Sequence, residues 1–236
     1  MNTLARQQKI KSFLPNIIIE ARFRLILAIL LSLFVVLPIF EFRMMLDAIL
    51  TLLVVVTLVL VIDTAKLLKV ALVFALLSII SNWTALWVNS TTVKLLGSSA
   101  ELIFMIMIAS VILNEVFRAQ HINVETISGA ICVYLLIGLM WSHVYIIIEL
   151  LEPNSFNNLG FNAQEPLDSD WVSKLSVQLN YYSFVTLSTL GYGDITPVTR
   201  AAKSFATLEA ILGQLYLAVL VARLVGQQVK RKISDS

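Results

Sequence analysis

Residues 186–197, TLSTLGYGDITP, place hydroxyl groups, two glycines and a carboxylate in one short segment between two long apolar runs. Gly191 and Gly193 flank Tyr192, and Asp194 follows directly. Glycine adopts positive φ values at little steric cost, so the backbone of this segment has unusual conformational freedom. The first question for function is therefore what this backbone contacts.

The segment that precedes it, SVQLNYYSFVTLST at residues 176–189, is too short and too polar to cross a bilayer. It is also too apolar and aromatic to lie in water. Backbone at membrane depth must bond internally, be buried in protein or line a water-filled cavity. A half-length helix followed by a glycine-rich return fits the last two conditions. Residues 152–170 are rich in Asn, Pro, Gly and acids and predict an exposed loop before it.

The composition indicates the environment of these segments. Of 236 residues, 58% are hydrophobic and 14% are charged, whereas soluble domains are about half apolar and a quarter charged. The chain is therefore predicted to be an all-α membrane protein that crosses the bilayer several times. A net charge of +2 is too small to indicate a nucleic-acid partner, and the single cysteine excludes an internal disulfide.

A helix needs about 20 mostly apolar residues to cross a bilayer. Six runs meet this requirement: Phe23–Phe40, Met44–Ile62, Leu67–Trp87, Leu95–Phe117, Ile127–Leu151 and Ala201–Val225. With both termini in the cytoplasm, the 17 basic residues divide 12 to 5 in favour of the cytoplasmic side, as the positive-inside rule requires. The five on the outer side are Arg43, Lys94, Lys174, Arg200 and Lys203.

Thr189 to Asp194, followed by Asp-x-x-Pro and flanked by a half-length helix and two spans, resembles the selectivity filter of tetrameric potassium channels. The resemblance covers about the last 110 residues. It implies an outer helix in span five, a re-entrant pore helix over Ser176–Ser188 and an inner helix in span six. One filter per chain implies a homotetramer around a central pore.

The resemblance also implies how the filter works. Carbonyl oxygens of Thr189, Leu190, Gly191 and Tyr192 replace the water shell of K⁺, and Gly193 joins Gly191 in allowing the unusual φ values that point them one way. Tyr192 is expected to pack against the pore helix. Leu190 stands where the family commonly has valine; if it loosens the filter, the chain is a weakly selective cation channel instead.

Further roles follow from the same matching. Asp194 is expected at the outer mouth, braced by the hydroxyl of Tyr182. Glu209 lies deep in span six, where an ionisable group is costly. It is expected to be a protonation-sensitive support of the filter from behind, so Glu209→Gln is expected to change open probability or pH response. Its expected polar partner is one of three residues: Ser188, Thr186 or Asn180. The alternative is a neutral, hydrogen-bonded glutamate with a structural role only.

In the inner helix, Gly213 falls where the family has its gating hinge, with close helix packing as the alternative reading. Gln214, Leu217 and Val221 are expected to line the cavity below the filter. The fourth span has no basic residue until Arg118 at its end, so a standard voltage sensor is not expected.

These expectations divide the chain into an N-terminal segment (1–22), a four-helix transmembrane domain (23–118), a pore domain (119–226) and a cytoplasmic tail (227–236). The pore domain comprises the outer helix, an extracellular loop at 152–175, a pore helix at 176–188, a filter at 189–194 and an inner helix at 200–225.

The predicted function is passive, potassium-selective conduction in a bacterial plasma membrane, with K⁺ as the permeant ion and no cofactor. An enzyme is not expected, because no nucleophile–base set, metal cluster or phosphate loop is present. A transporter subunit would need four pore repeats in one chain, and this chain has one. A non-conducting or regulatory subunit with a relic pore is the remaining alternative. Anionic lipids are possible partners of the basic N-terminal segment.

Overall fold

The computed structural model describes residues 21–36, 90–119, 122–160 and 171–234, with five isolated positions between 73 and 84. The predicted second span, Met44–Ile62, lies outside the described residues. Of the predicted third span, only the isolated positions are described, and these are helical. The expected N-terminal segment and its lipid contacts lie outside the described part as well.

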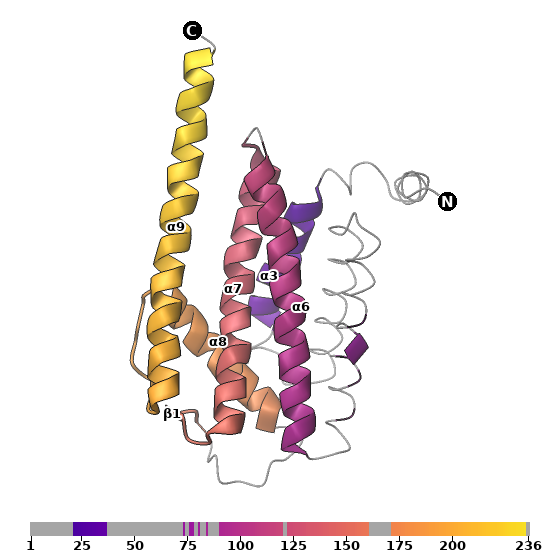
Figure 1. The fold of residues 1–236 in the computed structure, drawn as a ribbon, viewed down its shortest axis with the longest axis vertical. Helices are drawn as coiled ribbons and strands as arrows, with labels where there is room; N and C mark the ends of the chain where they lie inside the picture. Colours follow the sequence, from indigo (N-terminus) through magenta and orange to yellow (C-terminus); the bar gives the residue numbers. More distant parts are fainter. Residues whose placement is uncertain are drawn as a thin grey trace, which may run out of the picture.

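The described chain is mostly helical (Figure 1), with α3 (Arg22–Val36), α6 (Thr91–Arg118), α7 (Val124–Leu151), α8 (Trp171–Leu187) and α9 (Arg200–Ser234). Among the described helices, α6, α7 and α9 are long and apolar enough to cross a membrane. α7 occupies the centre and packs against α3, α6, α8 and α9. In Figure 1, α8 runs obliquely between α7 and α9 in the lower half of the view.

Two helices extend beyond their predicted bounds. α8 begins at Trp171 instead of residue 176, because Trp171 and Leu175 are buried in a core formed with α7 and the loop that follows it. α9 continues to Ser234 instead of ending at residue 225. No proline interrupts that stretch, and its Gln, Lys and Arg residues are good helix formers.

Side-chain caps set the starts of α7 and α9. Asn123 precedes α7, and its side-chain oxygen accepts a hydrogen bond of 2.8 Å from the backbone N–H of Thr126. Thr199 precedes α9 and accepts from the backbone N–H of Ala202 at 3.3 Å. Such caps satisfy backbone donors that a helix leaves free in its first turn.

The helices pack into two apolar clusters. One joins α3, α6 and α7 around Leu30, Ile112 and Val133. The other joins α7, α8 and α9 around Tyr145 and Leu179 and includes the loop after α7. The first cluster fixes the peripheral helices to α7, and the second fixes α8 between α7 and α9.

A short antiparallel pair, β1 (Phe156–Asn157) and β2 (Thr196–Pro197), places Phe156 opposite Pro197. It was not predicted from the sequence. The backbone N–H of Val198 also donates to the carbonyl of Ser155 at 2.8 Å. The pair ties the chain that leaves α7 to the chain that enters α9, so residues 188–195 are held at both ends.

Candidate functional site

The segment after α8 alternates in backbone conformation. Thr189, Gly191 and Gly193 have φ values of 59°, 56° and 77°, so the predicted unusual conformations at the two glycines are confirmed. Thr189 was not expected among them, because a β-branched residue at positive φ is an outlier that surrounding contacts must hold in place.

The N–H groups of this segment are bonded back to α8. Thr189 donates to the carbonyl of Thr186 at 2.9 Å, and Leu190 and Gly191 donate to that of Val185 at 3.0 and 3.2 Å. Within the described chain, the carbonyl oxygens of residues 189–193 accept no hydrogen bond, and these residues are exposed. The segment therefore presents a run of carbonyl oxygens without protein partners.

Two side chains of this segment are largely exposed in the single chain. Leu190 is 54% exposed and Tyr192 is 66% exposed. The expected packing of Tyr192 against a pore helix therefore stays a prediction for the assembly of several copies.

The tyrosine that contacts Asp194 is Tyr181, whose hydroxyl donates to Oδ2 at 2.6 Å. The expected brace, Tyr182, is wrong: its ring is buried and lies 5.1 Å, between centroids, from the rings of both Tyr145 and Phe156. Adjacent residues point about 100° apart around a helix. Tyr181 therefore reaches Asp194, whereas the next residue, Tyr182, points into the apolar core. The hydrogen bond from Tyr181 holds the pKa of the Asp194 carboxyl below its usual value.

The substitution Tyr181→Phe is therefore expected to raise the pKa of Asp194. The lowered pKa keeps the carboxylate charged in acid, and its charge is lost as the pH falls through that pKa. Without the hydroxyl donor, the loss begins at a higher pH. An NMR titration of the Asp194 carboxyl carbon measures this, with Tyr182→Phe as the control that leaves the curve in place. A curve moved by Tyr182→Phe alone would restore the original assignment.

Glu209, on α9, is fully buried between α7 and α8. Its Oε1 lies 2.5 Å from Oγ of Ser183, and its Oε2 accepts from the hydroxyl of Tyr145. Ser183 Oγ also lies 2.7 Å from the carbonyl oxygen of Gly138. These contacts join α7, α8 and α9 near the C-terminal end of α8.

None of the three expected partners contacts Glu209. The hydroxyl of Ser188 is bonded to the Phe184 carbonyl of its own helix at 2.6 Å, and that of Thr186 pairs with Tyr182. Ser183 lies on the side of α8 that packs against α7, which explains why it reaches Glu209 and they do not. Glu209 could be singled out from the sequence because an ionisable residue is unusual in an apolar helix.

α9 approaches the end of α8 closely at Gly213. A Cβ atom there would lie 2.5 Å from the carbonyl oxygen of Leu187, so the close-packing reading of this glycine is observed. The hinge stays a prediction. The next residue, Gln214, donates from Nε2 to Oγ1 of Thr189 at 3.2 Å. Leu217 and Val221 are exposed in the single chain, and their cavity position stays a prediction.

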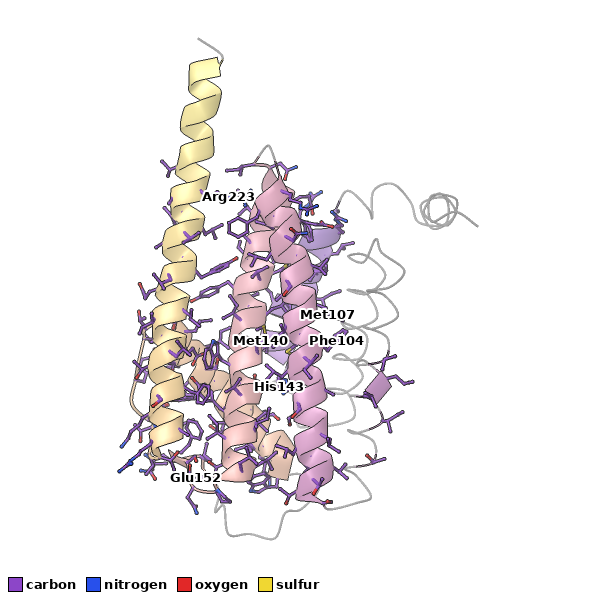
Figure 2. The ribbon with its side chains drawn as sticks, viewed as in Figure 1. Phe104, Met107, Met140, His143, Glu152 and Arg223 are labelled. Carbon is purple, nitrogen blue, oxygen red and sulfur yellow. The ribbon has the colours of Figure 1, made fainter. Side chains whose placement is uncertain are left out.

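The far end of α9 contacts the connection between α6 and α7 (Figure 2). The guanidinium carbon of Arg223 lies 4.7 Å from the ring centroid of Phe117, and Nη2 donates to the carbonyl of Ala119 at 3.4 Å. At the same end, Arg22 pairs with Glu115. At Arg223, α9 is thus attached to α6 and to the connection that follows it.

A further anchor missed from the sequence lies at the end of α7. The buried carboxylate of Glu149 accepts from the backbone N–H groups of Asn154 and Ser155 at 2.7 and 2.9 Å. Charge-assisted bonds of this kind order a loop strongly. The loop in turn supplies the Asn158 amide, which donates to the carbonyl of Asp194 at 3.0 Å.

Comparisons with known proteins agree with this geometry. Residues 133–229 match a family model described as an ion channel. Over 45 residues the chain is 44% identical to two pore potassium channel c of Oryza sativa subsp. japonica, which covers 19% of this chain and 10% of that protein. No solved structure matches significantly. The matched part holds most of α7, all of α8 and most of α9, and it is similar to an ion channel domain. The chain spans only a small part of the length of the rice potassium channel that it resembles.

Proposed function

We propose that this chain forms a potassium-selective channel that conducts K⁺ passively through residues 189–194. The observation that carries the proposal is the run of partnerless carbonyl oxygens in a segment of alternating φ. The ion channel domain and the similarity to a potassium channel support it.

The chemistry rests on replacing water with carbonyl oxygen. An ion that enters a narrow pore loses its hydration shell, and carbonyl groups at fixed positions must compensate. Positive φ at every second residue turns successive carbonyls toward one side, which a regular strand does not do. The proposed ligands are the carbonyls of Thr189, Leu190, Gly191 and Tyr192, with the Thr189 hydroxyl at the inner end.

A complete site needs several chains, because one segment supplies one wall. We assign four copies around one axis. The exposure of Leu190 and Tyr192 supports this, as does a row of exposed apolar residues on α9 that includes Leu208, Leu212 and Leu215. Both termini are assigned to the cytoplasm, with six spans in a bacterial plasma membrane.

Standard voltage sensing is not part of the proposal. In α6, the residues between Lys94 and Arg118 include no lysine or arginine. Lys94 itself is buried, with its Nζ 5.9 Å from the ring centroid of Trp171. Moving this helix would carry little positive charge across the membrane.

The test is ion flux into liposomes that contain the purified protein, measured separately for K⁺ and Na⁺. Faster K⁺ flux is the expected result. Equal fluxes would replace the proposal with a weakly selective cation channel, and no flux of either ion would indicate a non-conducting subunit.

Gln214 gives a prediction within this function. Gln214→Leu removes the donor to Thr189, the residue with the most strained backbone of the segment. The ratio of K⁺ to Na⁺ flux is expected to fall between about twofold and tenfold, as for the loss of one hydrogen bond. Thr207→Val, on the same helix, is the control, because within the part of the chain that the structure describes this hydroxyl bonds only to Lys203 of its own helix. An unchanged ratio in Gln214→Leu would remove the role of this contact.

A further inference from the structure

The cluster behind the filter contains three short contacts in series. Tyr145 of α7 meets one oxygen of the Glu209 carboxyl, and Ser183 of α8 meets the other. Ser183 then meets the carbonyl oxygen of Gly138, back on α7. The close approach at this point depends on Gly138, where a Cβ atom would lie 2.4 Å from the ring of Phe184.

Three hydrogen bonds in series require three hydrogens. The Gly138 carbonyl can only accept, so the hydrogen of Ser183 is committed to it. The contact between Ser183 and Glu209 then needs a hydrogen from the carboxyl group. The Tyr145 hydroxyl supplies the third, to the other carboxyl oxygen. All three contacts are satisfied when Glu209 carries a proton, and one lacks a hydrogen when it does not.

The surroundings favour the same state. The ionisable groups that interact with the Glu209 carboxyl are tyrosines: Tyr134 and Tyr145 of α7 and Tyr182 of α8. Within the described part of the chain, no lysine, arginine or histidine forms an ion pair with it. A buried carboxylate without a counter-ion is strongly disfavoured.

We infer that Glu209 is a neutral carboxylic acid that donates its proton to Ser183, and that this series of bonds positions α8 between α7 and α9. The functional part of the inference rests on the proposed channel function, because α8 carries the filter at its end. Glu209, Ser183 and Tyr145 are therefore positioning residues for the filter. A neutral Glu209 adds no charge that would act on K⁺ in the proposed filter.

Infrared spectroscopy of the full-length protein in liposomes at neutral pH tests the protonation. The difference spectrum between wild type and Glu209→Gln isolates this one carboxyl group from the other acidic residues. The expected difference is the loss of the carbonyl stretching band of a protonated acid. Loss of a carboxylate band instead would overturn the inference. This measurement holds whether or not the protein conducts, so it separates this inference from the channel function.

Flux through the same preparations tests the positioning role. Glutamine reproduces the series, since its oxygen accepts from Tyr145 and its amide donates to Ser183. We expect Glu209→Gln to keep K⁺ flux and K⁺/Na⁺ selectivity within about twofold of wild type, and Ser183→Ala to lower the selectivity roughly fivefold, because buried groups lose their partners. Ser110→Ala is the matched control, since among the described residues that hydroxyl bonds only to Ile106 of its own helix. A Gln variant more impaired than Ser183→Ala, or a silent Ser183→Ala, would overturn the positioning role.

Discussion

Gly193→Ala is expected to abolish selective K⁺ flux in liposomes. Gly193 has a φ of 77°, and a side chain in the left-handed region costs about 1–2 kcal/mol per residue. In a filter built from several copies this strain is present in each copy. Relaxation of the backbone at residue 193 to a negative φ is therefore favoured. Relaxation turns the carbonyl oxygens away from the ion path, and the expected loss of K⁺ flux is at least about tenfold.

Gly226→Ala is the matched control for this substitution. Gly226 lies in α9, has no positive φ, and a Cβ atom there meets nothing within 4 Å. The K⁺ flux of the Gly226→Ala protein should equal that of wild type. Wild-type flux in Gly193→Ala would mean that residues 189–194 are not the conducting path.

Gly213→Ala is expected to lower the thermal stability of the protein and to disturb the filter with it. Two effects oppose each other. Alanine gains up to about 1 kcal/mol over glycine in a helix interior, but its Cβ would lie 2.5 Å from the carbonyl oxygen of Leu187. That atom belongs to the backbone and cannot rotate away, and overpacking of this kind costs about 1–3 kcal/mol. The overlap therefore outweighs the gain.

The measurement is thermal unfolding in detergent together with K⁺ flux. Gly226→Ala serves again as the control, because it adds the same methyl group to the same helix in open space. A Gly213→Ala protein with unchanged melting temperature but altered open probability would favour the hinge over the packing role.

Much of the helical framework could be predicted from the sequence, because long apolar runs and a polar half-length segment are read directly from composition. The positive φ values of Gly191 and Gly193 were also predicted, since their backbone requirement is local. Thr189 was predicted as a residue of this segment, but its positive φ was not, because a β-branched residue rarely adopts that conformation.

The hydrogen-bond partners of Asp194 and Glu209 were less predictable from the sequence. Choosing Tyr182 over Tyr181 for Asp194 depended on the rotation of α8 about its axis, which composition does not determine. The partners of Glu209 depended on the same rotation and on the close approach that Gly138 permits. Contacts between helices of this kind are set by packing, so a sequence identifies the polar group that needs a partner before it identifies the partner.

The two ends of residues 188–195 are fastened to different helices. At one end, Gly213 and Gln214 attach the segment to α9. At the other, β1 and β2 attach it to the loop that Glu149 holds on α7. Residues 188–195 thus connect α9 to the loop after α7. Sliding α9 along α7 would therefore change the spacing of the carbonyls of residues 189–193, so the proposed filter would respond to displacement of the helices around it.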